Sequence, residues 1–182
     1  EVIHMEINIL ENEFWWGGSI DDGTLMPFSR STVGFSRDFR KVASNQTMPL
    51  YVSSMGRYIW SEKPFAVTID GGKFVLEGED IILVEAGKTL RDAYLTASKA
   101  HFPFTGKVPP LEFFSTAQYN TWMEFTYDPT EEGVLAYARA IVENGFKPGI
   151  LIIDEGWHRP YGDWSFDPSK FPHPKEMIAE LH

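Results

Sequence analysis

The pattern of apolar and polar positions changes character near the middle of the chain. Up to about residue 85, short apolar segments alternate with glycine-containing and polar turns, which is typical of antiparallel strands. Gly56 and the Asp70-Gly71-Gly72 sequence lie where tight hairpin turns are expected. The expected strands cover residues 2–8, 49–55, 57–60, 65–69, 73–77 and 80–85. Short strands at this spacing predict a β-sandwich.

Residues 17–46 fit the strand pattern less well. They are rich in Gly, Ser, Arg and Asp, and we expect a long polar loop between the early strands. Loops of that length in compact domains are usually functional or disordered.

A helix is expected over residues 89–102, where Thr89 and Asp92 fit a capping box and an apolar stripe follows. The proline-rich segment 103–110 ends with Pro109-Pro110, which stops both helices and central strands. We therefore expect a β-sandwich domain over residues 1–102, a linker over 103–110 and a different domain over 111–182.

In that second part, apolar segments alternate between strand and helix patterns. A strand over residues 118–124 precedes a helix whose start is expected at Asp128, with Pro129 at the first helical position and Glu131 completing a capping box. Gly145 ends this helix, a nearly continuous apolar strand covers 149–154, and a further helix begins at Pro174. This order predicts a right-handed parallel βαβ unit.

Composition narrows the possible partners. The formal charge is −10, which argues against nucleic acid or an anionic membrane as partner, and no apolar segment approaches the length of a membrane span. The absence of Cys excludes disulfides and thiolate nucleophiles. We expect no metal or cofactor, because the five His residues lack zinc-helix spacing and no phosphate loop or dinucleotide fingerprint occurs. Aromatic residues make up 15% of the chain, which with the acidic balance suits a sugar-binding cleft.

The most informative motif follows the apolar strand 149–154. In parallel α/β folds, ligands bind outside the carboxyl ends of the strands, and this strand ends in Asp154-Glu155-Gly156-Trp157. Adjacent strand residues point to opposite faces, so Asp154 and Glu155 are a poor acid–base pair across one bond. We interpret Asp154 as a ligand for substrate hydroxyls. The alternative is that Asp154 caps a turn and Trp157 packs the loop.

Alternation along the preceding strand places Asn120, Trp122 and Glu124 on one face. This set could form a stacking platform with polar groups that orient a ligand. Equally, Trp122 could be a ring of the core.

Several segments resemble glycoside hydrolase family 31. In the second part these are Tyr119-Asn120-Thr121-Trp122-Met123-Glu124, Ile152-Ile153-Asp154-Glu155-Gly156-Trp157, Tyr161-Gly162-Asp163-Trp164-Ser165-Phe166-Asp167-Pro168 and Phe171-Pro172-His173-Pro174. Upstream, Met48-Pro49-Leu50-Tyr51 and Gly56-Arg57-Tyr58-Ile59-Trp60 look like the sandwich hairpin of that family. The resemblance implies a β-sandwich N-terminal domain followed by the first βα units of a (β/α)8 TIM barrel. It also implies retaining hydrolysis of α-linked glycosides without a metal.

By position, Asp154 matches the family aspartate that binds sugar hydroxyls in the −1 subsite. Asp38 is the candidate for an aspartate that an N-domain loop of the family sends into that subsite, with Asp21 and Asp22 as rivals. Trp122 lies near an aromatic subsite wall, and Glu155 and Trp157 complete the expected substrate-binding set. The Asp-Glu-Gly-Trp sequence is also similar to the Asp-Asp-Gly-Trp of α-galactosidase barrels. The candidate substrates therefore include α-galactosides as well as α-glucosides and α-xylosides.

The chain departs from the family in one respect. The family nucleophile and acid/base are aspartates on later barrel strands, which would follow His182. A (β/α)8 barrel takes roughly 200–250 residues, whereas residues 110–182 have room for about two βα units. We therefore expect no catalytic residue in this chain, inactivity of the chain alone, and the remainder of the barrel as its partner beside a carbohydrate substrate. Rival interpretations are a non-catalytic carbohydrate-binding module and a regulatory or assembly subunit. A secreted, a periplasmic and a cytoplasmic location are all compatible with the sequence.

Overall fold

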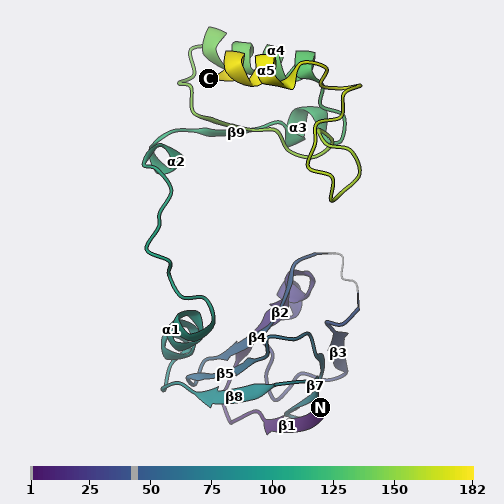
Figure 1. Cartoon of the computed structure of the whole chain (residues 1–182). Coiled ribbons are helices and arrows are strands. Elements are labelled where there is room, and N and C mark those ends of the chain that lie inside the picture. The colour runs from purple at the N-terminus through teal and green to yellow at the C-terminus, as the bar shows by residue number, and fades with distance from the viewer. Residues whose placement is uncertain (1, 42–44) are drawn as a thin grey trace. The chain divides into compact units, whose positions relative to one another are not determined.

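The computed structural model describes residues 2–41 and 45–182. The chain divides into two compact units, Glu1–Thr105 and Gly106–His182, which are described separately (Figure 1).

The first unit contains two antiparallel four-stranded sheets. Its strands are β1 (Ile3–Asn8), β2 (Trp15–Ser19), β3 (Phe35–Asp38), β4 (Thr47–Ser53), β5 (Arg57–Trp60), β6 (Ala66–Asp70), β7 (Lys73–Gly78) and β8 (Ile82–Glu85). One sheet has the order β1-β7-β6-β3 and the other β2-β4-β5-β8. A shared aromatic and aliphatic core includes Trp15, Phe28, Tyr51, Phe65 and Phe74. The prediction of a β-sandwich is confirmed.

The β6–β7 hairpin follows directly from its sequence. Gly71 and Gly72 both have positive φ, +56° and +77°, as a two-residue hairpin turn requires. Along β6 and β7 alternate residues are buried, which places Val67, Ile69 and Phe74 in the core. The expected hairpin is confirmed.

The expected long polar loop over residues 17–46 is wrong. This segment contains the end of β2, a 3-10 helix η1 (Ile20–Leu25) and the edge strand β3, while residues 42–44 lie outside the described part. Gly17 belongs to a strand because a Cβ there would meet the Leu50 carbonyl oxygen at 2.1 Å. The glycines therefore permit close approach of two strands, at a register shift between Gly17 and Gly18.

Helix α1 (Leu90–His101) covers the outer face of the β2-β4-β5-β8 sheet. Thr89 and Asp92 form the expected capping box, in which the Thr89 hydroxyl accepts from the Asp92 amide and the Asp92 carboxylate accepts from the Thr89 amide. Ala93 and Ala97 are buried against Tyr58, which attaches the helix to β5.

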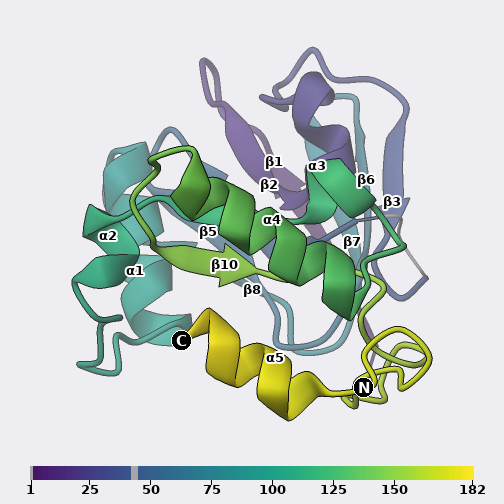
Figure 2. The ribbon, with the colours of Figure 1, turned by 90° about the horizontal axis from the view of Figure 1, so that it is seen from above.

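The second unit is built on two parallel strands, β9 (Gln118–Asn120) and β10 (Ile150–Ile152). Its helices are α2 (Glu112–Ser115), α3 (Trp122–Phe125), α4 (Glu131–Glu143) and α5 (Pro174–Leu181). Helices α4 and α5 lie side by side (Figures 1 and 2), and a core of Val134, Phe171 and Met177 joins them to Leu151 and Ile153. The expected strand–helix–strand order is present. Gly145, with φ +78°, ends α4.

Two details of this unit differ from expectation. Strand β9 ends at Asn120, whose Oδ1 accepts the Trp122 amide at 2.7 Å and turns the chain into α3. Trp122 and Glu124 are therefore in a helical turn and do not share a strand face with Asn120. The N-cap of α4 is Thr130, not Asp128, because the Glu131 amide donates to the Lys170 carbonyl and the Thr130 hydroxyl accepts from Gly133.

Candidate functional site at the carboxyl ends of β9 and β10

Asn120 and Asp154 meet where the two parallel strands end. Nδ2 of Asn120 donates to Oδ2 of Asp154 at 2.7 Å. Between them lies the buried Thr121, whose amide donates to the Ile152 carbonyl at 3.1 Å and whose hydroxyl accepts from the Asp154 amide at 3.1 Å. The two strand ends are thus tied through both backbone and side chains.

The orientation of Asp154 is fixed from two sides. Its Oδ1 accepts from the Glu155 amide at 2.9 Å while Oδ2 accepts from Asn120. The Asn120 amide is itself oriented, because its oxygen accepts from Trp122. Each carboxylate oxygen has two lone pairs, so each can accept one further hydrogen bond from a hydroxyl. Asp154 therefore caps a turn, as the alternative interpretation of this residue expects. Its two carboxylate oxygens still offer hydrogen-bond acceptors at the end of the strand.

Glu155 faces the loop that follows. A hydrogen bond to the Glu155 carboxylate raises the pKa of Tyr161 to about 12. Gly156 has φ +82°, and a Cβ there would lie 2.2 Å from the Tyr127 carbonyl oxygen. The loop after β10 is thus pressed against the loop after α3, and only glycine fits between them.

Trp157 is half-buried and anchors this loop to the core of the unit. Its ring centroid lies 5.0 Å from that of Phe166, and the cluster around Phe171 includes both rings. The packing interpretation of Trp157 is therefore correct for much of its ring, although its other neighbours are the rings of His158 and Trp164.

Trp122 and Asp38 occupy different environments. The Trp122 ring packs edge-on against Tyr127, with centroids 4.9 Å apart, next in sequence to the Asn120–Thr121 turn. Asp38 lies on β3 in the first unit, where hydrogen bonds from Arg40 hold the pKa of its carboxyl below the usual range. Its rival Asp22 is buried and paired with Arg37. Asp154, Glu155, Trp157 and Trp122 thus all lie in the second unit, and Asp38 lies in the first. The substrate-binding roles of these residues stay predictions.

Lys170 is a residue that the sequence reasoning missed. Its Nζ donates to the carbonyl oxygens of Tyr127 at 3.0 Å and Gly156 at 3.3 Å, and lies 3.0 Å from a carboxylate oxygen of Asp128. It clamps the two loops beside Asp154. No local sequence signal marks a lysine for this contact.

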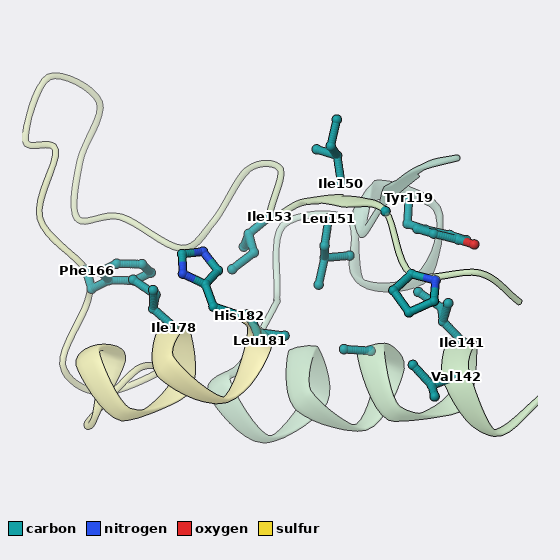
Figure 3. Close-up of a pocket in the computed structure, with 13 residues that line it drawn as sticks. Tyr119, Ile141, Val142, Ile150, Leu151, Ile153, Phe166, Ile178, Leu181 and His182 are labelled. Carbon is teal, nitrogen blue, oxygen red and sulfur yellow. The ribbon is translucent and has the colours of Figure 1, made fainter. Parts of the chain in front are cut away.

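A large cavity of the second unit lies elsewhere. Figure 3 shows it between β10 and the helices, with Leu151 and Ile153 pointing toward α4 and α5. Its volume is about 510 Å³ and its lining is mainly aliphatic, including Ile141 and Ile178. Such a lining offers few partners for sugar hydroxyls, so this space belongs to the helix–sheet packing.

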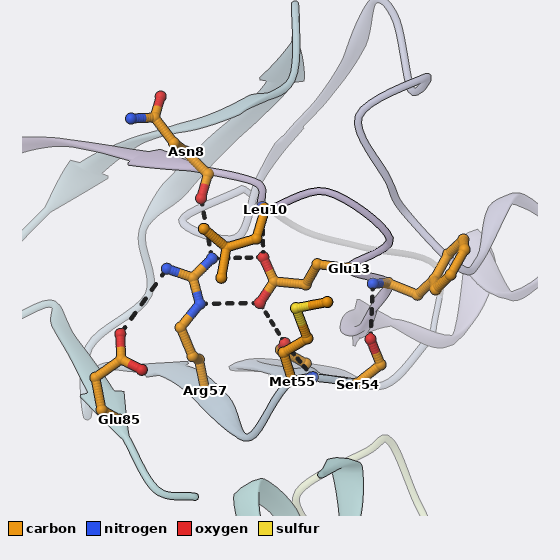
Figure 4. A network of polar contacts seen from close by, with 9 residues as sticks. Asn8, Leu10, Glu13, Ser54, Met55, Arg57 and Glu85 are labelled. Carbon is orange, nitrogen blue, oxygen red and sulfur yellow. Dashed lines mark hydrogen bonds and ion pairs between the residues drawn. The ribbon is translucent and has the colours of Figure 1, made fainter. Parts of the chain in front are cut away.

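The first unit contains a buried ion pair between Glu13 and Arg57 (Figure 4). Arg57 Nε donates to Glu13 Oε1 at 2.9 Å, and its Nη2 donates to Glu13 Oε2 and to the Asn8 carbonyl. The Leu10 amide and the Ser53 hydroxyl complete the bonding of the carboxylate. Burial alone would raise the pKa of Glu13, but these hydrogen bonds and the Arg57 charge outweigh it and lower the pKa. This pair is structural.

Within residues 2–41 and 45–182, no group of three or more His, Asp or Glu side chains is arranged to hold a metal ion. In the same part of the chain, no helix has the length and apolar character needed to cross a membrane.

Comparison by sequence finds a relative that matches part of the chain. No family model matches the chain. Over 83 residues it is 30% identical to the myogenesis-regulating glycosidase of Mus musculus, a match that covers 46% of this chain and 12% of that protein.

Solved structures match almost the whole chain. A xylosidase from Aspergillus niger gives a TM-score of 0.69 at 16% identity, covering 99% of this chain and 25% of that one. A GH31 dextranase from Flavobacterium johnsoniae gives 0.62 at 14% identity, covering 99% and 23%. A GH31 α-xylosidase from a soil metagenome, complexed with xylose, gives 0.61 at 18% identity, covering 99% and 26%.

The chain has the fold of an N-terminal region of glycoside hydrolase family 31 enzymes, so the resemblance inferred from the sequence is confirmed. It spans about a quarter of each of these solved proteins and 12% of the mouse relative.

Proposed function

We propose that this chain is the substrate-binding amino-terminal part of a retaining α-glycosidase that hydrolyses α-linked glucosides, xylosides or galactosides. The observation that carries the proposal is the Asn120–Asp154 hydrogen bond, which places an oriented carboxylate at the carboxyl ends of two parallel strands. Ligands of parallel α/β folds bind at that end of the strands. The fold shared with xylosidases and a dextranase supports a sugar as the ligand.

In this proposal β9 and β10 are the first strands of a (β/α)8 barrel. Within the described residues the two strands pair only with each other, so each has an open edge. Ile152 is 39% exposed although it lies in a strand of three apolar residues. Parallel strands are normally covered on both faces and paired at both edges, which supports a larger barrel completed by other segments.

The proposed chemistry assigns binding to this chain and bond cleavage to residues outside it. A carboxylate attacks the anomeric carbon, a second carboxylic acid protonates the leaving oxygen, and the transition state is oxocarbenium-like. Asp154 accepts a hydrogen bond from a hydroxyl of the sugar at the cleavage point, and this bond tightens as charge develops on the ring. Glu155, Trp157 and Trp122 line the same site. The chain alone is inactive in this scheme.

Asp38 is proposed as a further sugar ligand from the first unit. Its carboxylate is held ionised by Arg40, which suits an acceptor of sugar hydroxyls. Its rivals are Asp21 and Asp22, and the Asp22 carboxylate is buried and paired with Arg37.

The test is a panel of 4-nitrophenyl α-glucoside, α-xyloside and α-galactoside, assayed with the complete gene product and with the β-anomers as controls. We expect hydrolysis of at least one α-glycoside with retention of anomeric configuration, which NMR of the first-formed sugar reports. Binding of these sugars without hydrolysis would instead favour a carbohydrate-binding module. Hydrolysis with inversion would contradict the assigned reaction.

A further inference from the structure

The loop that follows the Asp154 motif exposes two large aromatic rings. Trp164 is 76% exposed and Tyr161 is 73% exposed, although both lie in a loop whose other rings, Trp157 and Phe166, pack against the core. Exposed single aromatics are common, but neighbouring exposed rings beside polar groups mark interaction surfaces.

The two rings are held by a folded loop. His158 and Phe166 form a backbone bridge, and the Arg159 amide donates to the Ser165 carbonyl, so the loop closes as a short hairpin. At its tip the Asp163 amide donates to the Pro160 carbonyl. The rings therefore project from an ordered frame.

Contacts between the rings make one surface. The His158 ring lies between them, with its centroid 5.0 Å from that of Tyr161 and 5.9 Å from that of Trp164. The Trp164 centroid is 6.3 Å from that of Trp157. These four rings run from the residue three positions after Asp154 outward to the exposed end of the loop. We call residues 157–164 with these rings the aromatic loop.

Carboxylates border this surface. Asp163 is next to Trp164 in the sequence, and its Oδ1 accepts from the Ser165 amide at 3.2 Å. The Glu155 carboxylate raises the pKa of the Tyr161 hydroxyl. Aromatic faces stack on the flat C–H faces of pyranose rings, while carboxylates and the phenol hydroxyl bind the hydroxyls at the ring edge. A membrane or nucleic acid would need cations, and Arg159 is the only Lys or Arg between positions 155 and 169 of the printed sequence.

We propose that the aromatic loop is a second sugar subsite that binds the pyranose ring linked to the sugar held by Asp154. Trp164 is the stacking platform, and the Tyr161 hydroxyl binds a hydroxyl of that second ring. This inference rests on the proposed function and extends it from one sugar unit to two. It makes the loop a determinant of preference for di- and oligosaccharides over simple glycosides.

The experiment compares substrates with and without a second ring. The complete gene product is assayed on α-D-glucosyl, α-D-xylosyl and α-D-galactosyl fluoride, which have no second ring, and on isomaltose, isoprimeverose and melibiose, in which the same sugars are α-1,6-linked to glucose. The variants are W164A, W164F and Y161F. The matched control is F104A, which removes an aromatic ring that is also 76% exposed but lies outside the loop.

We expect W164A to lower kcat/KM at least tenfold on the disaccharide through a higher KM, and to change kcat/KM on the fluoride less than twofold. W164F should restore most of the loss, and F104A should match the wild type on both substrates. An equal loss on fluoride and disaccharide, or no loss on either, would overturn the subsite.

A wild-type protein that hydrolyses neither kind of substrate would overturn the proposed function instead. In that case saturation-transfer NMR with the same disaccharides decides the subsite. Transfer to protons of the glucose unit that W164A abolishes and F104A retains would support the subsite, and its absence in the wild type would contradict it.

Discussion

Asn120 donates a hydrogen bond from its Nδ2 to Oδ2 of Asp154 at 2.7 Å, across the carboxyl ends of two parallel strands. The same Asn120 accepts from the Trp122 amide, so its amide orientation is fixed by both neighbours. If Asp154 binds a sugar hydroxyl, as proposed, this arrangement orients its carboxylate in advance and reduces the ordering that binding would otherwise require.

Replacing Asn120 should therefore weaken the site without abolishing it. We expect N120A in the complete gene product to lower kcat/KM on its best aryl α-glycoside by about 1–2 kcal/mol, or roughly 5- to 30-fold, as for loss of one hydrogen bond to a charged group. The control is N144A, which removes an amide-to-carbonyl bond at the end of α4. Equal activity of N120A and N144A would contradict the positioning role.

Gly156 should tolerate no side chain. Both Gly156 and Gly162 have positive φ, +82° and +97°, so alanine at either position carries a backbone penalty of about 1–2 kcal/mol. Only at Gly156 would the new Cβ meet the Tyr127 carbonyl oxygen at 2.2 Å, whereas nothing lies within 4 Å at Gly162. We expect denaturant unfolding to show G156A less stable than G162A by about 1–3 kcal/mol. Equal stabilities would mean that the two loops are not packed as described.

Lys170 should control the order of the loop after β10. Removing its ammonium in K170M frees the carbonyl oxygens of Tyr127 and Gly156, to which it donates. We expect faster hydrogen exchange at Gly156 and Trp157 and a higher KM, with little change at K175M, which removes an exposed lysine of α5. Unchanged exchange in K170M would show that the clamp does not hold the loop.

The first unit should lose stability in acid through Glu13. The pKa of this carboxyl is below its ordinary value of 4.5 in the folded state, so its contribution is complete above about pH 4.5 and is lost as the pH falls through the folded pKa. In E13Q, urea unfolding followed from pH 7 to pH 3 should show a weaker fall in stability than in the wild type. A parallel fall in both proteins would rule out Glu13 as the source.

At neutral pH, removing one partner of the Glu13–Arg57 pair should lower the stability of the first unit. We expect R57M to destabilise the first unit by about 3–5 kcal/mol, because it leaves the buried Glu13 carboxylate without its cation. The matched control is K73M, which breaks the exposed pair with Glu6 and should change stability little. Similar effects of R57M and K73M would contradict the structural role of the buried pair.

The sequence predicted features whose causes are local. The Gly71-Gly72 turn, the Thr89 capping box and the end of α4 at Gly145 depend on residues next to one another, and each was expected where it lies. Strand β2 was missed because Gly17 is explained only by the approach of Leu50, which is far away in sequence. The start of α4 was placed two residues too early, because both Asp128 and Thr130 are good N-cap residues and only Thr130 accepts the Gly133 amide.

The candidate site also contains both residues that the sequence predicts and a contact that it does not. A carboxylate placed after an apolar strand could be read from the motif, so Asp154, Glu155 and Trp157 were expected at one strand end. The partner of Asp154 could not be read, because strand β9 was expected to run on to Glu124. The turn at Asn120 is what brings its amide to Asp154.

The most direct test of the central claim is the activity of D154A in the complete gene product. Truncating Asp154 should remove about 2–4 kcal/mol of transition-state stabilisation, so kcat/KM on the best aryl α-glycoside should fall roughly 30- to 1,000-fold. The melting temperature should stay close to that of the wild type. An unchanged kcat/KM in a folded D154A protein would remove Asp154 from the sugar site and contradict the account.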